Sequence, residues 1–274
     1  KVTAVLEQLC GTSVSSTQVS KASALLDEIL KAWRQRPLCE CPYLILDARY
    51  ERVRQDGQLR DAAILMACGI DLKGKRHLLG VSASLGEHEI HWRTFLEELV
   101  ARGLRGVQLI TSDDHQGLKA ARMAVFGGVP WQHCQFHLQQ NASSHVTRRA
   151  MLSEVAADIR GIFNAPDRST AEFFLQKAIE KYEKTASKLA DWLEKNIPEG
   201  LTVFAFPAAH RRLLRTTNGL ERVSREVHRR TRVVGIFPNE AACLRLVSAV
   251  LMEIDDAWQV GRVYLTFEED VPLS

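Results

Sequence analysis

Three consecutive runs of apolar or alternating residues, separated by two turns, constrain the fold of this chain more than any other feature. The runs are YLILDARYERVR (43–54), LRDAAILMACGID (59–71) and KRHLLGVSASL (75–85). Asp56-Gly57 and Lys73-Gly74 stand between them, and pairs of this kind mark tight turns. Short apolar or alternating runs bounded by turn residues predict strands. The sequence therefore predicts a three-stranded antiparallel meander.

Helical and strand patterns alternate after the meander. HEIHWRTFLEELVARGL (88–104) repeats apolar residues at helical spacing, and Gly103 closes it. GVQLITSD (106–113) is predicted as a fourth strand, QGLKAARMAVFG (116–127) as a helix and VPWQHCQFH (129–137) as a short fifth strand. The expected fold class is therefore α/β, with a mixed sheet flanked by helices.

Residues 138–216 carry helical patterns without a strand signal, which predicts an all-helical insertion. Its clearest helices are MLSEVAADIRGIF (151–163), TAEFFLQKAIEKYEK (170–184) and ASKLADWLEKN (186–196). A basic helix follows the insertion. After Pro238 we expect one more long helix and a short strand-like tail.

The N-terminal residues 2–34 predict a short helix, a break at Gly11 and a longer helix capped by Ser15 or Ser16. This pattern fits a DNA-binding helix-turn-helix, and it fits two packed helices without a DNA role equally well. The expected organisation is a helical, HTH-like segment (1–40), the first part of the core (41–137), the helical insertion (138–216) and the second part of the core (217–274).

Length and composition are those of a globular protein. At 274 residues and 46% apolar content the chain can bury a sizeable core. No apolar run reaches the roughly 18 residues that span a bilayer. The six cysteines lack the spacing of a disulfide framework, which indicates free thiols in a reducing compartment. A net charge of +3 is too small to identify a nucleic-acid partner by itself.

Arginine is concentrated in one segment, where it predicts a surface that binds phosphate. The arginines are Arg211, Arg212, Arg215, Arg222, Arg225, Arg229, Arg230 and Arg232. Glu221 lies among them, and a carboxylate facing phosphate is repulsive unless a cation lies between the two. Two interpretations stay open: Glu221 closes a capping box with Asn218 as N-cap, or it binds a metal ion.

Two other acids stand at positions where a strand meets a cleft. Asp47 follows the apolar run Leu44-Ile45-Leu46 inside the first strand, where a charge is costly unless it meets a cation. Asp113 ends the fourth strand, where α/β sheets expose side chains to ligands. If the first and fourth strands are neighbours, the two carboxylates come together, and a shared divalent metal would relieve their repulsion. For each acid alone, an ordinary strand-end or turn role remains open.

The segment Cys134 to His137 has the C-x-x-H form of half a zinc site. Because no second pair follows at zinc spacing, the sequence does not predict a zinc site. Neither a glycine-rich nucleotide loop nor the nucleophile motif of serine hydrolases is present, so the sequence carries no signal for those functions.

Four blocks in this order resemble the Mutator-like bacterial insertion-sequence transposases. They are YLILDARYERVR around Asp47, ITSDDHQGLKAA around Asp113, WQHCQFHLQQN, and RTTNGLERVSREVHRRTRVVGIFPN around Glu221. The resemblance extends over nearly the whole chain. Two departures are Asp114, where the family usually has glycine, and Gln140, where arginine is common. Asp114 therefore competes with Asp113 as a metal ligand, although the register favours Asp113.

The resemblance implies a ribonuclease H-like core with a DDE triad, in which Asp47, Asp113 and Glu221 are catalytic and bind Mg²⁺, with Mn²⁺ expected to substitute. The implied activity is Mg-dependent DNA strand nicking followed by strand transfer, a transesterification at transposon ends. The eight arginines would hold DNA phosphates, and His137 and Cys134 would support the site. Trp192 either stacks on an unpaired base or packs with Leu189 and Leu193.

The partners implied by the resemblance are double-stranded DNA and a second copy of the chain, a homodimer acting on nucleoid-associated DNA in the bacterial cytoplasm, with no membrane partner. Two other functions stay open. One is a ribonuclease H-like nuclease or resolvase that cuts without joining. The other is a non-catalytic, transposase-derived DNA-binding protein, against which the presence of all three acids argues.

Overall fold

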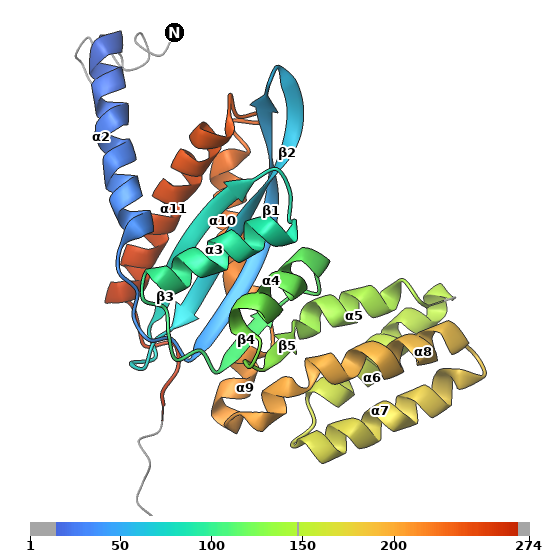
Figure 1. The fold of residues 1–274 in the computed structure, drawn as a ribbon. Helices are drawn as coiled ribbons and strands as arrows, with labels where there is room; N and C mark the ends of the chain where they lie inside the picture. Colours follow the sequence, from blue (N-terminus) through green and yellow to red (C-terminus); the bar gives the residue numbers. More distant parts are fainter. Residues whose placement is uncertain (1–14, 147, 268–274) are drawn as a thin grey trace, which may run out of the picture.

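The structure, a computed structural model, describes residues 15–146 and 148–267 (Figure 1). Its centre is a five-stranded sheet with the order β3-β2-β1-β4-β5. The strands are β1 (Tyr43–Gln55), β2 (Gln58–Ile70), β3 (Arg76–Ser84), β4 (Leu109–Ser112) and β5 (Trp131–His133). β1 to β3 pair antiparallel, whereas β4 and β5 run parallel to β1. The predicted α/β class with a mixed sheet is confirmed, as is the meander.

The two predicted turns set the register of the meander. Asp56 and Gly57 both adopt positive φ, 50° and 75°, which joins β1 to β2 in a two-residue hairpin with Gln55 opposite Gln58. Gly74, with φ of 72°, turns the chain from β2 into β3. The bulge between Ala67 and Cys68 shifts the pairing of β2 with β3 by one residue.

Ten helices are described. They are α2 (Ser16–Gln35), α3 (Glu89–Ala101), α4 (Gln116–Phe126), α5 (Gln135–Ser143), α6 (Leu152–Phe163), α7 (Arg168–Glu183), α8 (Ser187–Asn196), α9 (Ala208–Leu214), α10 (Asn218–Thr231) and α11 (Glu240–Val260). Three short 3₁₀ segments also occur, at Arg149–Met151, Ile197–Gly200 and Thr202–Ala205.

Helices cover both faces of the sheet, because side chains along β1 alternate between two cores. Leu44 and Leu46 pack on one face with α3 residues such as Trp92. Ile45 points to the other face, where it joins Val223 of α10 and side chains of α11. The sheet is therefore buried on both sides, as Figure 1 shows for α3 in front of it and α10 and α11 behind it.

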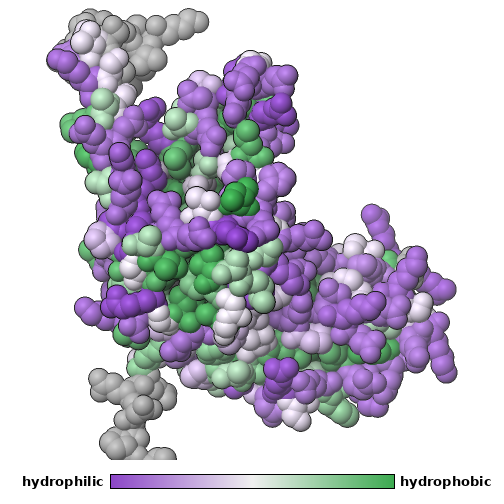
Figure 2. Space-filling view, in the orientation of Figure 1, coloured by the Kyte–Doolittle hydropathy of each residue, from purple (hydrophilic) through white to green (hydrophobic). Residues whose placement is uncertain are grey.

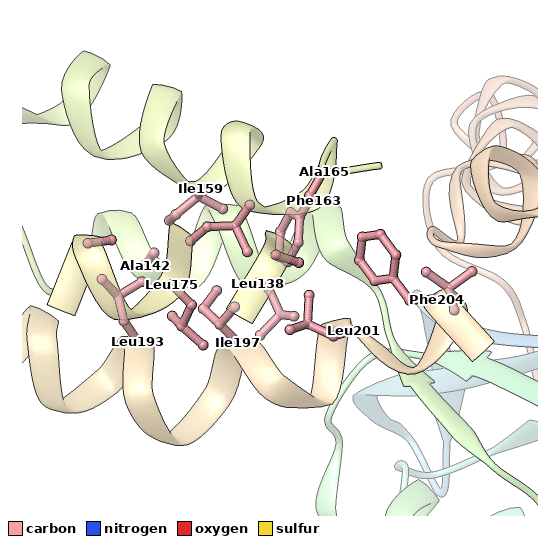
Figure 3. Packing of buried hydrophobic residues seen from close by; sticks show 14 of the residues in the cluster. Leu138, Ala142, Ile159, Phe163, Ala165, Leu175, Leu193, Ile197, Leu201 and Phe204 are labelled. Atoms are coloured by element: carbon pink, nitrogen blue, oxygen red, sulfur yellow. The ribbon is translucent and has the colours of Figure 1, made fainter. Parts of the chain in front are cut away.

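The helices α5 to α9 form a lobe beside the β5 edge of the sheet (Figure 1). They bury their own hydrophobic cluster, in which Leu138 of α5, Ile159 of α6 and Leu193 of α8 point toward one another (Figure 3). Hydrophilic side chains cover most of the visible face of this lobe (Figure 2). Every described element between β5 and α10 is helical, in agreement with the predicted insertion.

Two sequence predictions were wrong in detail. The strand predicted over 129–137 is only three residues long, because β5 ends at His133 and Gln135 already starts α5. The tail after α11 is not a strand within its described residues. There the N–H groups of Tyr264 and Leu265 both donate to the carbonyl oxygen of Gly74, at 2.9 and 3.2 Å, without forming a ladder.

At the N-terminal end, Ser15 caps α2 as predicted. Its side chain accepts from the backbone of Gln18, whose side chain accepts from the backbone of Ser15 in return. α2 packs along α11, where Arg245 binds Asp27 at 2.6 Å. The first helix of the predicted helix-turn-helix lies outside the described residues. Among the helices that are described, none combines the length and apolarity needed to cross a bilayer.

Candidate active site

Asp47 and Asp113 lie side by side at the boundary between β1 and β4. The two strands are parallel, and Ile45 pairs with Thr111. Asp47 is two residues beyond Ile45 and Asp113 two residues beyond Thr111, so the same register places the acids opposite each other. The expected juxtaposition of the two strands is thus present.

Glu221 reaches the same place from the first turn of α10. The capping box proposed for it does not form, because the helix begins one residue earlier than that interpretation requires. Thr217 is the N-cap, Asn218 is already helical, and Glu221 is the fourth helical residue. Its Oε1 accepts from the Thr217 hydroxyl at 3.1 Å. The carboxylate is therefore free of the backbone contact that would turn it away from the acids.

His137 stands between two of the acids. Its Nδ1 lies 3.9 Å from Asp113 Oδ2, and its Nε2 lies 4.0 Å from Glu221 Oε1. A hydrogen bond with Cys134 and the charges of Cys134, Asp113 and Glu221 raise the pKa of His137 to about 9, against the opposing effect of burial. The imidazolium is thus an internal cation that offsets the charge of the acids.

Cys134 is buried and fixes the start of α10. Its sulfur accepts from both the backbone N–H and the hydroxyl of Thr217, each at 3.4 Å. Burial alone would raise the pKa of Cys134, but hydrogen bonds with His137 and Thr217 outweigh it and lower the pKa. Sulfur, imidazole and the Glu221 carboxylate lie within 4.8 Å of one another, so the C-x-x-H segment meets an acid as its neighbour.

The electrostatics of the acids are those of a site that lacks a counter-cation. Burial raises the pKa of Asp47 to about 7; the charges of Asp113 and Glu221 raise it further, and His137 opposes the rise. The Oδ1 atom of Asp113 is buried and has no hydrogen-bond partner among the described residues. An unpaired buried carboxylate oxygen is costly, and a metal ion is one group that would pair it.

A cavity of about 740 Å³ opens between β1, α5 and α10. Asp47 and Glu221 line it, together with His137. Arg222 and Arg225 lie on its rim with exposed side chains. The cavity therefore places acids at its floor and cations at its entrance, an arrangement suited to an anionic ligand.

Asp114, the other acid beside Asp113, is engaged elsewhere. Lys119 lies 3.3 Å from its Oδ1 and 3.2 Å from Glu199 Oε1. Its charge is therefore already balanced by a lysine, whereas Asp113 faces His137. This difference favours Asp113 over Asp114 as the candidate ligand.

The eight arginines separate into groups with different contacts. Arg211 donates to the carbonyl oxygens of Phe206 and Pro166, and Arg215 donates to that of Phe163, so both brace the insertion. Arg229 and Arg230 both bind Glu226, at 2.6 and 3.2 Å. The side chains of Arg212, Arg222, Arg225 and Arg232 are exposed. These four present their charge to solvent most directly.

Arg49 was missed in the sequence, although it lines the cavity. Its guanidinium pairs with Glu51 at 2.8 Å, contacts the carbonyl oxygen of Ser224 and lies 3.0 Å from His228 Nδ1. Glu51 also accepts from Thr231 at 2.8 Å. Opposite charges two residues apart face the same side of a strand, and this was the available signal. The network holds α10 against β1.

Trp192 is half-buried in the insertion. Its ring stacks on His145 with centroids 5.5 Å apart, and it packs against the hydrophobic cluster of the lobe. This is the position expected of a packing residue. A role in base stacking stays a prediction.

Comparison with known proteins agrees with this arrangement. The model of a family described as "Transposase, Mutator family" matches residues 1–261. The chain is 60% identical over 269 residues to the transposase for insertion sequence element IS406 of Burkholderia multivorans, covering 97% of this chain and 69% of the relative. It is 40% identical to the transposase for ISRM5 of Rhizobium meliloti, covering 98% and 68%, and 34% identical to that for IS256 in transposon Tn4001 of Staphylococcus aureus, covering 98% and 70%.

A mixed sheet with three acids gathered at β1, β4 and α10 defines a protein with an acidic site suited to phosphate chemistry on DNA. The chain belongs to the Mutator family of transposases.

Proposed function

We propose that this transposase nicks DNA at transposon ends and transfers the freed strand to a target, with Asp47, Asp113 and Glu221 as the catalytic acids. The convergence of these acids around His137, with an unpaired Oδ1 on Asp113, is the observation that supports the proposal most. The strand order β3-β2-β1-β4-β5, with the first two acids on neighbouring parallel strands, supports a ribonuclease H-like core.

The residues fit Mg²⁺, with Mn²⁺ as a substitute. Carboxylate oxygens are the ligands that both ions prefer, and three acids of raised or unbalanced charge share this site. Asp47, Asp113 and Glu221 would hold the metal. When bound, it would lower the pKa of a water molecule and stabilise charge on the scissile phosphate.

The reaction consists of two displacements at phosphorus. In the first, water replaces one bridging oxygen and leaves a 3′-hydroxyl at the transposon end. In the second, that 3′-hydroxyl replaces a bridging oxygen in the target strand. Each step forms one P–O bond and breaks one, so no nucleotide hydrolysis is required.

Protein side chains around the acids would orient this reaction. Arg222 and Arg225 would bind the phosphates that flank the reacting one, giving affinity without sequence readout. His137 would keep the carboxylates of Asp113 and Glu221 in place from between them. The proposed partners are double-stranded DNA and, since two transposon ends must be handled, a second copy of the chain.

The test incubates the protein with Mg²⁺, target DNA and a labelled duplex that carries the element's own terminal sequence. Asp47→Asn, Asp113→Asn and Glu221→Gln should each lower nicking and joining by about 10³-fold or more. Asp114→Asn is the matched control, because its carboxylate pairs with Lys119. It should keep activity within about tenfold of the wild type.

Three results would contradict parts of the proposal. Undiminished strand transfer in Glu221→Gln would exclude Glu221 from the triad. Nicking without a joined product would favour a nuclease or resolvase. A retarded band with neither reaction would favour a non-catalytic DNA-binding protein.

A further inference from the structure

A second cavity lies next to the candidate active site, and one aromatic residue belongs to both. Phe136 lines the catalytic cavity beside His137 and also lines a groove between α5 and α6 of about 320 Å³. No residue of this groove takes part in the proposed chemistry. The groove is large enough to hold a small organic group.

The lining of the groove selects a neutral, flat group with polar edges. Its walls include Val146, Leu152 and Ala156, and the amides of Gln139 and Gln140 lie along it. None of the described residues that line it carries a charge. A phosphate would therefore be a poor occupant, whereas a heterocycle could bury its faces and hydrogen-bond its edges to the amides.

Phe136 is held in an exposed position by the residues around it. On either side of it, Gln135 donates to the carbonyl oxygen of Gly200 at 2.8 Å, and His137 faces the acids. Leu138 occupies the hydrophobic cluster. The Phe136 side chain is consequently 47% exposed, with its ring edge-on to that of His137 at 5.5 Å. An exposed ring on an anchored helix is a stacking platform.

The two cavities together match the two parts of a nucleotide. One has arginines at its rim for phosphate, and the adjoining one is uncharged and partly apolar. We propose that an unpaired nucleobase next to the scissile phosphate stacks on Phe136 and enters the groove between α5 and α6. This assignment rests on the proposed function, since it places DNA at the acids. It adds to that function a residue that recognises distorted or unpaired DNA.

The experiment uses the whole chain in EDTA, so that no strand is cut, and two short duplexes of equal flanking sequence. One contains a single unpaired 2-aminopurine, and the other is fully paired. The wild type should bind the first about 5- to 100-fold more tightly, the range expected for stacking of one base on an aromatic ring. Stacking should also change the fluorescence of the 2-aminopurine.

Variants locate the base. Phe136→Ala should lose the preference, and Phe136→Trp should keep it. Ala156→Trp, which fills the groove without touching the platform, should also lose it. Phe173→Ala is the matched control, because Phe173 is a 58% exposed phenylalanine on α7 of the same lobe. It should keep the full preference, and melting curves confirm that each variant is folded.

Equal binding of both duplexes by the wild type, or a preference that survives in Phe136→Ala, overturns the inference. A preference that survives in Ala156→Trp overturns the groove as the site. The proposed function fails separately: a protein that prefers the unpaired base but never nicks or joins DNA contradicts only the activity. A protein that joins strands without any preference contradicts only this inference.

Discussion

The carboxyl group of Asp47 opposes folding whenever it is ionised without a metal ion. It is half-buried at the end of an apolar run, and Asp113 and Glu221 lie near it. Its pKa rises from 3.8 to about 7 for these reasons. Between these values the folded protein binds more protons than the unfolded chain, so the stability contributed at this site falls as the pH rises. Metal-site acids often carry such a cost, because their geometry serves the ion.

Asp47→Asn should therefore stabilise the metal-free protein, and the gain should depend on pH. We expect little difference near pH 4 and a gain of roughly 1 to 3 kcal/mol above pH 7, because each unit of pKa shift corresponds to about 1.4 kcal/mol. Thermal or urea unfolding in EDTA at a series of pH values measures the effect. Asp114→Asn, whose carboxylate pairs with Lys119, should show no such gain. A gain in Asp47→Asn that is the same at every pH would contradict this explanation.

At the scale of elements, the site depends on how closely the helices approach the sheet and its loops. α4 begins directly after the loop that carries Asp113 and Asp114, and Gly117 lies in its first turn. A Cβ atom at Gly117 would meet the backbone carbonyl oxygen of Glu87 at 2.0 Å. The absence of a side chain at this residue therefore lets α4 pack against the segment between β3 and α3.

Two helical glycines give a matched pair of substitutions. Gly117→Ala should destabilise the protein by about 2 kcal/mol or more, because the backbone of Glu87 has to move. Gly161→Ala in α6 should stabilise it by about 0.5 to 1 kcal/mol, because nothing lies within 4 Å of the added Cβ and alanine favours the helix. Urea unfolding of the two variants measures both effects. Equal losses in the two would show that helix propensity, and not the contact, is limiting.

At the scale of the whole molecule, the insertion is joined to the sheet by a small buried polar network. The Gln132 amide, at the centre of β5, donates to the carbonyl oxygen of Gly200 at 2.8 Å and accepts from the N–H of Val203 at 2.7 Å. Gln135 donates to the same Gly200 oxygen. The end of the insertion is therefore fastened to the strand next to the one that leads to Asp113.

Gln132→Ala should cost about 2 to 4 kcal/mol, because it leaves the buried Val203 N–H unpaired and removes a bond to Gly200. Hydrogen exchange should show the loss of protection concentrated in residues 197–205. The exposed residue Gln176, which bonds only Glu180 at 3.3 Å, provides the control variant Gln176→Ala. A loss of protection spread evenly over β1 and β2 would mean that the network does not fasten the insertion separately.

The sequence alone determined the elements whose cause is local. The glycine turns placed the meander, Ser15 placed the start of α2, and helical spacing placed the helices of the insertion within a few residues. It also placed Asp47 and Asp113 at strand positions that parallel pairing then brought together. These features depend on neighbours in the chain or on a repeating period, and both are visible in the sequence.

Only the tertiary structure decided the features that depend on distant residues. The short run WQHCQFH fits a strand and a helix equally well, and contacts with the insertion end the strand at His133. The capping box expected at Asn218 gave way to Thr217, which is held by the sulfur of Cys134, 83 residues earlier. The position of His137 between two acids, and the division of the arginines into bracing and exposed groups, likewise come from long-range packing. Such contacts have no period and no fixed spacing, so the order of residues does not reveal them.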